Sequence, residues 1–207
     1  MWDFLNYLKL SNCKEEIENS ILEIVNCYKN KGKLLICGNG GSASDSLHIV
    51  GELMKSFVLS RKLENKYIDK IKNIFPQEAE YFINNLQSSL PAIALVSETS
   101  LITAYSNDNN SELVFAQQVL GYGNEGDILI AISTSGNSKN VIYASQISKV
   151  KGMKVISLTG KLGGELKDIS DININVEEKE TYIIQEYHLS IYHTLCLEVE
   201  NEIFGEE

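Results

Sequence analysis

Residues 33–42 read KLLICGNGGS, a short apolar run that stops abruptly at a glycine-rich turn. A helical pattern resumes directly after the turn, with Ser44 and Asp45 as the expected capping residues. An apolar run bounded by glycine is typical of a buried strand, so this stretch predicts a strand, a turn and a helix in that order. Such a unit is the repeat of an α/β fold.

The same pattern recurs in the second half of the chain. Residues 127–132 form another apolar run, which leads into STSGNS at 133–138, and a helical periodicity follows from Val141 to Val150. Three further stretches are candidates for buried strands: residues 92–96, 154–158 and 172–176. Apolar strands that alternate with helices predict a parallel sheet with helices on both faces.

The remaining segments are predicted to be largely helical. Apolar residues at helical spacing predict one long amphipathic helix over about residues 3–30 and another from about Thr181 to Phe204. Residues 60–90 are richer in Lys, Glu and Asn, with helical patches at 67–75 and 78–86. We expect one domain spanning residues 1–207, with an inserted helical segment at about 60–90.

Composition narrows the classes of function. The 18 Lys and Arg residues against 28 Asp and Glu give a net charge of -10, which disfavours binding to nucleic acid or to an anionic membrane. No stretch reaches 18 apolar residues and the N-terminal residues lack a signal-peptide pattern, so we expect a cytoplasmic protein. The cysteines have no paired spacing, which fits reduced thiols: Cys13, Cys27, Cys37 and Cys196.

The glycine-rich turn at residues 38–42 is a candidate phosphate-binding loop. Glycine lets the backbone approach an anion closely, and the start of the following helix offers unpaired N–H groups. The alternative is that the glycines only form a tight turn between strand and helix. A dinucleotide site is disfavoured, because Ser42-Ala43-Ser44 follows where a third glycine is needed and the next strand is about fifty residues away.

The loop at residues 133–138 favours the phosphate interpretation, because it places four hydroxyl groups at the expected carboxyl end of a strand. Hydroxyl groups and helix N–H groups can hydrogen-bond phosphate oxygens without any lysine or arginine. The negative net charge requires such a local solution, because the overall field opposes an anion. The alternative is that these residues only cap the next helix.

Two pairs of polar residues are candidates for proton transfer. His48 and Glu52 are four apart and share one face of the helix that follows the glycine-rich turn. Gln185 and His193 are eight apart, on nearly one face of the last helix. The set has the donor types for a divalent ion such as zinc and equally for acid–base catalysis near neutral pH. We expect His188 to be a packed or surface residue without a catalytic role.

Five stretches together closely resemble the phosphoheptose (sedoheptulose-7-phosphate) isomerase family of the SIS, or sugar isomerase, domain class. They are residues 37–57, 107–108, 131–140, 152–164 and 185–198. The resemblance implies a Rossmann-like three-layer sandwich with a five-stranded parallel sheet, and a homotetramer with active sites at subunit interfaces. It further implies conversion of sedoheptulose 7-phosphate to D-glycero-D-manno-heptose 7-phosphate through an enediol, for bacterial surface-heptose synthesis in lipopolysaccharide or capsule.

The family's functional residues carry over to positions of matching type. Its catalytic pair corresponds to Glu52 and His193. Its zinc ligands, which imply one zinc ion per subunit, correspond to His48, Glu52, Gln185 and His193. Its substrate-binding residues correspond to Asn39, Gly40, Gly41, Ser42, Glu52, Asn107, Asp108, Ser133, Thr134, Ser135, Ser138 and Gln185.

Two alternatives stay open at this point. Some relatives of the SIS class are not enzymes but sense a sugar phosphate or bind a replication-initiator protein. The replication-associated kind lacks the equivalents of Glu52 and His193, and the presence of both residues favours an enzyme. An isomerase or epimerase for another phosphosugar is the second alternative, because the loops recognise the phosphate and not the length of the carbon chain.

Overall fold

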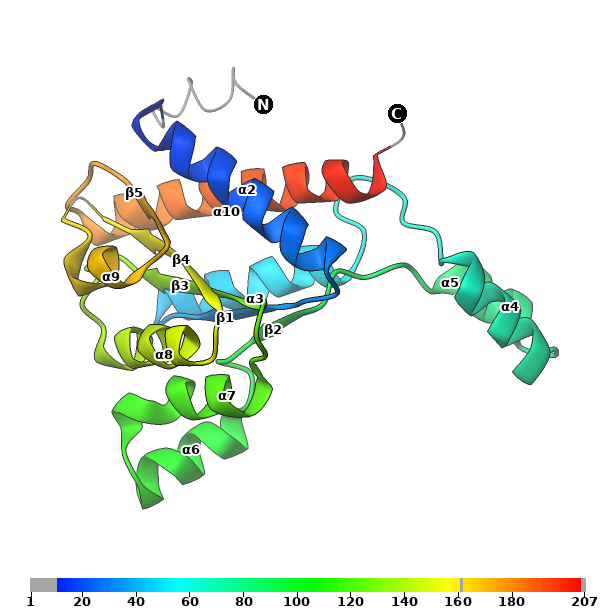
Figure 1. Ribbon diagram of the computed structural model, residues 1–207, viewed down its shortest axis with the longest axis horizontal. Helices are drawn as coiled ribbons and strands as arrows, with labels where there is room; N and C mark the ends of the chain where they lie inside the picture. The colour runs from blue at the N-terminus through cyan, green and yellow to red at the C-terminus, as the bar shows by residue number, and fades with distance from the viewer. Residues whose placement is uncertain (1–10, 161, 206–207) are drawn as a thin grey trace.

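The computed structural model describes residues 11–160 and 162–205, and in these ranges five parallel strands form one sheet. The strand order is β2-β1-β3-β4-β5 (Figure 1). The strands are β1 (Leu34–Cys37), β2 (Ala92–Ala94), β3 (Ile128–Ser133), β4 (Lys154–Thr159) and β5 (Ile172–Asn175). All five predicted strands and the parallel α/β class are therefore confirmed.

The register of the sheet brings the two predicted loops together. β1 pairs with β3 from Leu34 opposite Ile128 to Cys37 opposite Ala131. β2 adds to the other edge of β1, so the chain winds in both directions from the centre of the sheet. Ligands of open parallel sheets bind at such a switch point, beyond the carboxyl ends of the strands. The glycine-rich turn after β1 and the serine-rich loop after β3 lie at this edge.

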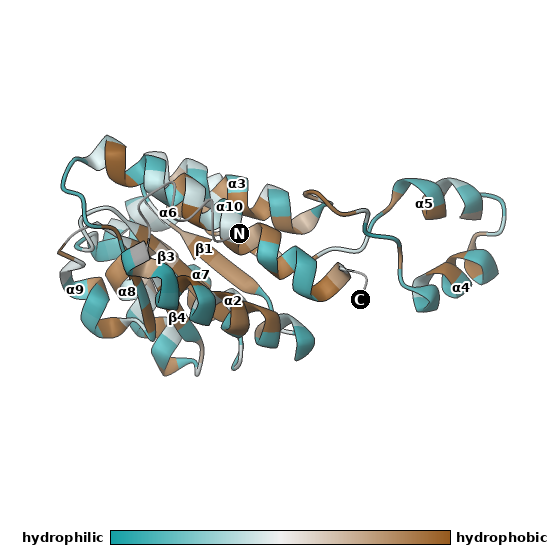
Figure 2. Cartoon of the chain, turned by 90° about the horizontal axis from the view of Figure 1, so that it is seen from above, coloured by the Kyte–Doolittle hydropathy of each residue, from teal (hydrophilic) through white to brown (hydrophobic). Residues whose placement is uncertain are grey.

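Two layers of helices cover the sheet, because successive strand residues point to opposite faces. Leu34 and Ile36 pack with residues of α2 (Lys14–Lys29), α3 (Gly41–Met54) and α10 (Thr181–Phe204). Leu35 and Cys37 pack with the other layer, which contains α7 (Val114–Tyr122), α8 (Lys139–Val150) and α9 (Gly164–Ile169). The predicted three-layer sandwich is confirmed, and the sheet between the layers is mostly apolar (Figure 2).

The helix predictions are confirmed in part. The last helix spans Thr181–Phe204, as predicted. The first predicted helix, at about residues 3–30, is seen as the short 3-10 turn η1 (Ser11–Cys13) followed by α2. Its first part, up to residue 10, lies outside the described residues. The prediction that Ser44 and Asp45 cap α3 is wrong, because this helix already begins at Gly41, with Gly40 at a positive φ of 57° before it. No helix in the described ranges meets the length and hydropathy needed to cross a bilayer.

Residues 62–88 leave the sandwich as a helical hairpin, whereas Arg61 and Leu90, near the two ends of the predicted segment at 60–90, are buried. Its helices are α4 (Asn65–Ile74) and α5 (Ala79–Asn85), as the helical patches predicted, and they project away from the sheet (Figures 1 and 2). The two ends of the hairpin are joined where the backbone N–H of Ser88 donates to the carbonyl of Arg61 at 3.2 Å. The Ser88 hydroxyl donates to the carbonyl of Lys62 at 2.7 Å. The chain thus returns to β2 close to the point where it left.

Candidate active site

The two predicted phosphate loops lie next to each other at the carboxyl ends of β1 and β3. Asn39 and Asn140 are joined by two reciprocal amide hydrogen bonds of 2.8 and 2.9 Å. The backbone N–H of Ser42 donates to the carbonyl of Asn39, which closes the turn that starts α3. The N–H groups of Ala43 and Ser44 both donate to the carbonyl of Gly40, so the positive end of the α3 dipole, next to exposed Gly40 and Gly41, is what this turn offers to an anion.

The hydroxyl groups of the serine-rich loop gather into one cluster. The oxygen of Ser133 lies 3.0 Å from that of Ser138 and 3.5 Å from that of Ser135. Ser138 precedes α8 but its side chain makes no capping hydrogen bond. Its hydroxyl is therefore available to a ligand, which argues against capping as the only role of this loop. Thr134 is half-buried, and its carbonyl accepts from the N–H of Gly160.

Close backbone packing fixes the shape of this loop. Gly136 has a positive φ of 67°, and a Cβ there would lie 1.9 Å from the carbonyl oxygen of Gly163. The N–H of Leu166 donates to the carbonyl of Gly136, and the N–H of Glu165 donates to the side chain of Asn137. A loop held this way presents its hydroxyls with little conformational freedom to lose on binding.

The second part of the site lies on α3 and α10, where His48, Glu52 and His193 meet. The Nε2 atom of His48 is 3.3 Å from Oε1 of Glu52, as expected for residues four apart on a helix. The imidazole rings of His48 and His193 meet edge to face, with centroids 5.0 Å apart. The ring of Phe57 also lies next to His193, tilted by 45° with the centroids 5.7 Å apart.

Burial sets the proton affinity of His193. Its Nε2 atom is buried and has no hydrogen-bond partner in the described part of the chain. Burial lowers the pKa of His193 below 6.5, and the nearby His48 lowers it further. His193 is therefore neutral at pH 7 and has a nitrogen without a partner, as a proton acceptor or a metal ligand requires.

Two residues that the sequence did not single out orient His48. Its Nδ1 atom is 2.9 Å from the hydroxyl of Tyr192, and this hydroxyl donates to Oδ1 of Asp45 at 3.4 Å. When Nδ1 carries the proton and donates to Tyr192, Nε2 presents its lone pair beside Glu52. This is the tautomer that outer hydrogen bonds select in metal-binding histidines. The sequence predicts only a capping role for Asp45 and singles out no role for Tyr192.

The remaining predicted residues lie elsewhere. The carboxamide of Gln185 packs directly against Gly41, in the space that a Cβ at this position would occupy. Gly41 lies seven residues before His48, which is about 10 Å along the helix, so Gln185 is separated from the histidine cluster. Asn107 and Asp108 are exposed at the end of α6 (Thr99–Asp108) and hydrogen-bond each other. The structure therefore brings three of the four predicted zinc ligands into one cluster and leaves Gln185 beside the glycine-rich turn.

The donor types and the spacing of the side chains bear on whether the cluster could hold a metal ion. Across residues 11–160 and 162–205, no three His, Cys, Asp or Glu side chains converge into a metal-binding group. The donor types and the unpartnered Nε2 atom of His193 still fit a zinc ion. His188 lies apart, fully buried, with Nε2 3.3 Å from the carbonyl oxygen of Thr159. Of the two predicted environments, packed or surface, His188 has the packed one, and its lack of a catalytic role stays a prediction.

The sheet and its paired loops have the architecture of the SIS class, and the family model described as "SIS domain" matches residues 73–160. Phosphoheptose isomerase of Helicobacter pylori is 41% identical over 90% of this chain and 84% of its own. The phosphoheptose isomerase of Clostridium acetobutylicum is 39% identical over 93% of this chain and 85% of its own length. The solved phosphoheptose isomerase of Francisella tularensis superposes with a TM-score of 0.75 at 34% identity, covering 90% and 86% of the two chains. The chain belongs to the phosphoheptose isomerase family.

Proposed function

We propose that this chain is an aldose–ketose isomerase that converts sedoheptulose 7-phosphate to D-glycero-D-manno-heptose 7-phosphate. The observation that carries the proposal is the cluster in which both Glu52 and His193 contact His48. His48 and Glu52 lie on α3, the helix that begins at the proposed phosphate loop. The names and coverage of the relatives support the same activity. The contact of His48 with both Glu52 and His193 supports the assignment of this chemistry to one site.

Isomerisation needs a base that removes a proton from C1, next to the C2 carbonyl, and an acid that delivers a proton to C2. The enediol between these steps lets the two carbons exchange oxidation states within one molecule, so no external oxidant is needed. Glu52 and His193 are the groups proposed to share the two roles, because the lowered pKa of His193 keeps its nitrogen free to accept a proton. The ring of Phe57 shields His193 from water on one side.

The phosphate of the substrate is proposed to bind between the two loops. Ser133, Ser135 and Ser138 supply the hydroxyl cluster, together with Thr134. The turn of Asn39, Gly40, Gly41 and Ser42 supplies the start of α3, whose N–H groups and dipole favour an anion. Gln185 lies against Gly41, beside this turn. This arrangement recognises a phosphate without cationic side chains.

We further propose that each subunit binds one zinc ion through His48, Glu52 and His193, with Gln185 as the fourth ligand. Zinc at this position would stabilise negative charge on the oxygens of the enediolate. The proposal is supported by the unpartnered nitrogen of His193 and by the hydrogen bond that orients His48. Gln185 would have to leave Gly41 to join the other three ligands.

The assembly is proposed to be a homotetramer with active sites at subunit interfaces. Asn107 and Asp108 support this, since α6 lies outside α7, away from α3 and α10 (Figure 1), and the pair hydrogen-bonds only within itself. Such residues reach a substrate more readily in a neighbouring subunit. The four free cysteines support a cytoplasmic location, and the proposed product supports a place in surface-heptose synthesis for lipopolysaccharide or capsule.

The decisive experiment is to incubate the purified protein with five- to seven-carbon ketose phosphates and to follow the formation of aldose phosphates, with and without zinc. We expect turnover to be fastest with sedoheptulose 7-phosphate. Glu52→Gln and His193→Ala should each lower kcat by about 100-fold or more, because each removes a proton-transfer group. Glu23→Gln, in an ion pair on α2, is the matched control and should keep full activity.

Retention of near-normal turnover by Glu52→Gln on every substrate would contradict the assigned chemistry. Absence of turnover by the wild-type protein, together with tight binding of the sugar phosphates, would instead favour a non-enzymatic SIS module. Bound zinc is the second measurement, since His48→Ala and His193→Ala should both lower it.

A further inference from the structure

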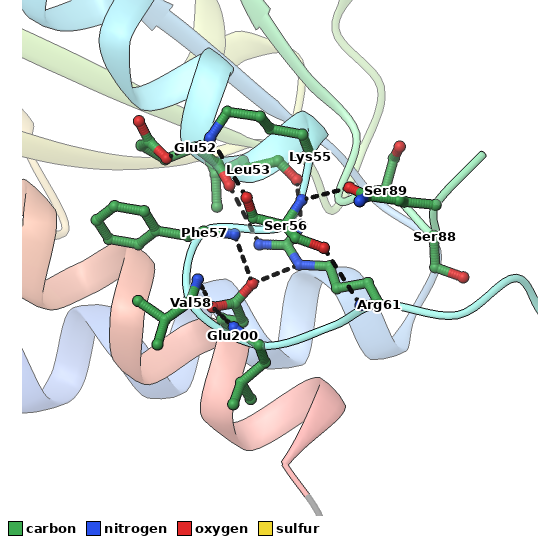
Figure 3. Close-up of polar contacts among 12 residues, drawn as sticks. Glu52, Leu53, Lys55, Ser56, Phe57, Val58, Arg61, Ser88, Ser89 and Glu200 are labelled. Carbon is green, nitrogen blue, oxygen red and sulfur yellow. Dashed lines mark hydrogen bonds and ion pairs between the residues drawn. The ribbon is translucent and has the colours of Figure 1, made fainter. Parts of the chain in front are cut away.

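The segment that follows α3, residues 55–61, is tied to α10 by one buried carboxylate. We name this segment the strap. The backbone N–H groups of Phe57, Val58 and Leu59 donate to the carboxylate of Glu200 at 2.9, 2.8 and 3.0 Å (Figure 3). Glu200 is 1% exposed, so the carboxylate that accepts these hydrogen bonds is itself buried. A single side chain of α10 thus fixes three consecutive residues of the strap.

Arg61 connects the same carboxylate to the end of α3. Its Nε atom donates to Glu200 at 2.6 Å, its Nη1 atom to the carbonyl of Leu53 at 2.6 Å and its Nη2 atom to the carbonyl of Glu52 at 3.1 Å (Figure 3). Carbonyls in the last turn of a helix have no partner within the helix, and this guanidinium supplies one. One planar group therefore binds both helices at once.

The pair has the properties of a built structural element and not of an incidental surface contact. The side chain of Arg61 is fully buried, and its guanidinium also lies 5.0 Å from the ring centre of Phe204. A buried charge is tolerated only when its partners satisfy it, and removal of one partner leaves the other unpaired. The planar fork of arginine matches the carboxylate and the two carbonyls, which the ammonium of lysine cannot match.

The two helices joined by this pair carry the proposed acid–base groups. We call the ion pair of Arg61 and Glu200 the clamp. The backbone carbonyl of Glu52 accepts from Arg61 and its side chain belongs to the site, so the clamp holds a residue of the site directly. His193 lies seven residues before Glu200, two turns along one face of α10. The strap also carries Phe57, whose ring packs on His193. Arg61 and Glu200 thus join α3 and α10 at one end of the site.

We propose that Arg61 and Glu200 are positioning residues of the isomerase, which hold Glu52, His193 and Phe57 in register without touching the substrate. This inference rests on the proposed function for its kinetic test, and it has a second readout that is independent of activity. Displacement of a catalytic group by about 1 Å lowers turnover by about 100-fold. Phosphate binding, at the other end of α3, is expected to depend much less on the clamp.

The test uses Glu200→Gln, which keeps the size of the side chain and removes its charge. The matched control is Asp127→Asn, because Asp127 is also buried, accepts from two backbone N–H groups and pairs with Lys33, but it contacts neither α3 nor α10 through these bonds. We expect Glu200→Gln to lower kcat by about 10- to 100-fold with KM changed less than about threefold. Asp127→Asn should lose stability but keep kcat.

The independent readout is the NMR spectrum of the labelled histidine side chains, of which the chain has three. Glu200→Gln should shift the imidazole signals of His48 and His193 and leave that of His188 in place, even if no substrate of the enzyme is found. Unchanged signals and kcat in a folded Glu200→Gln protein would overturn the proposal. Equal losses of kcat in Glu200→Gln and Asp127→Asn would also overturn it, since they would reflect general destabilisation.

If Glu200→Gln does not fold, Arg61→Lys replaces it in both measurements. Lysine keeps the positive charge but cannot reach the carboxylate and both carbonyls together. Wild-type kcat and imidazole signals in Arg61→Lys would overturn the proposal, whereas a lowered kcat with a near-normal KM supports it.

Discussion

The serine hydroxyls after β3 form a cluster whose members lie within 3.5 Å of Ser133. Hydroxyls that hydrogen-bond one another can exchange these bonds for bonds to a phosphate, so the free loop resembles its bound form. Each hydrogen bond to a charged group contributes about 1.5–3 kcal/mol. The phosphate is remote from the reacting carbons, so this contribution is nearly equal in the ground state and the transition state.

We therefore predict that Ser133→Ala combined with Ser135→Ala raises KM by at least about tenfold and changes kcat much less. Steady-state kinetics with the preferred ketose phosphate measures both constants. Ser145→Ala is the matched control, because Ser145 is a buried serine of α8 that hydrogen-bonds only the carbonyl of Val141. An unchanged KM in the double variant would show that this loop does not hold the phosphate.

His188 gives a prediction about stability. Burial lowers its pKa to about 4, against about 6.5 in the unfolded chain. Between these values the unfolded state binds one proton more than the folded state, so stability is lost as the pH falls from 6.5 towards 4. The free energy of unfolding should decrease by about 1.4 kcal/mol per pH unit in this window.

Urea denaturation at pH 7 and pH 5 tests this prediction. His188→Gln removes the titrating group but keeps an amide that can donate to Thr159. The midpoint of the wild-type protein should fall more steeply with decreasing pH than that of the variant. Equal slopes would show that His188 is not kept neutral by burial.

A contact between residues close in sequence could be predicted from their spacing, whereas a contact between distant residues could not. His48 and Glu52 could be paired in advance because a spacing of four fixes their contact on a helix. Arg61 and Glu200 are 139 residues apart, and each has the sequence context of an ordinary surface charge. The position of Gln185 against Gly41 likewise depends on how α10 packs on α3, which no local pattern encodes.

Among the elements, the strands were predictable and several helices were not. A strand buried on both faces is a continuous apolar run, and residues 128–132 have no other interpretation. The helices α6 and α7 gave no amphipathic signal: none of the residues of α6 is buried, whereas the first three of α7 all are. The buried residues of α7 start with three in a row, and Leu120 and Tyr122 near its end are exposed, so burial does not follow the helical period on which prediction relies.

The hairpin of α4 and α5 provides a prediction at the same scale. We propose that the chain is a single SIS domain into which residues 60–90 are inserted. None of the residues between Lys62 and Ser88 belongs to either core cluster, and the two ends are already joined by hydrogen bonds. Replacement of residues 63–87 by a short Gly-Asn-Gly linker should preserve the fold, because a shorter loop costs less conformational entropy to close.

Circular dichroism during thermal unfolding measures the outcome. The shortened protein should keep a cooperative transition, whereas a deletion extended to residues 59–87 should not, since it also removes Arg61 from its contacts with Glu200 and Leu53. Loss of the transition in the shorter deletion would show that the hairpin is an integral part of the fold.

At the scale of the whole molecule, a net charge of -10 and a site for an anion have to coexist. The proposed anion site would avoid the overall field by using dipoles at the carboxyl edge of the sheet, where the serine loop and the start of α3 lie together. The same layout leaves apolar side chains exposed on the helices that carry the proposed chemistry. Leu47 and Met54 on α3, and Tyr182 and Leu189 on α10, are each more than a third exposed.

We predict that these exposed residues are covered by other subunits and that the protein is a homotetramer. Light scattering after size exclusion should give four times the chain mass of 23.1 kDa. Leu189→Lys places a charge where an apolar contact is expected and should cause dissociation, because a stable interface depends on a few well-packed apolar residues. Val150→Lys, on the outer side of α8, is the matched control and should leave the mass unchanged. A concentration-independent monomer would contradict the prediction. A fully active monomer of Leu189→Lys would show that the active site does not need residues of a second subunit.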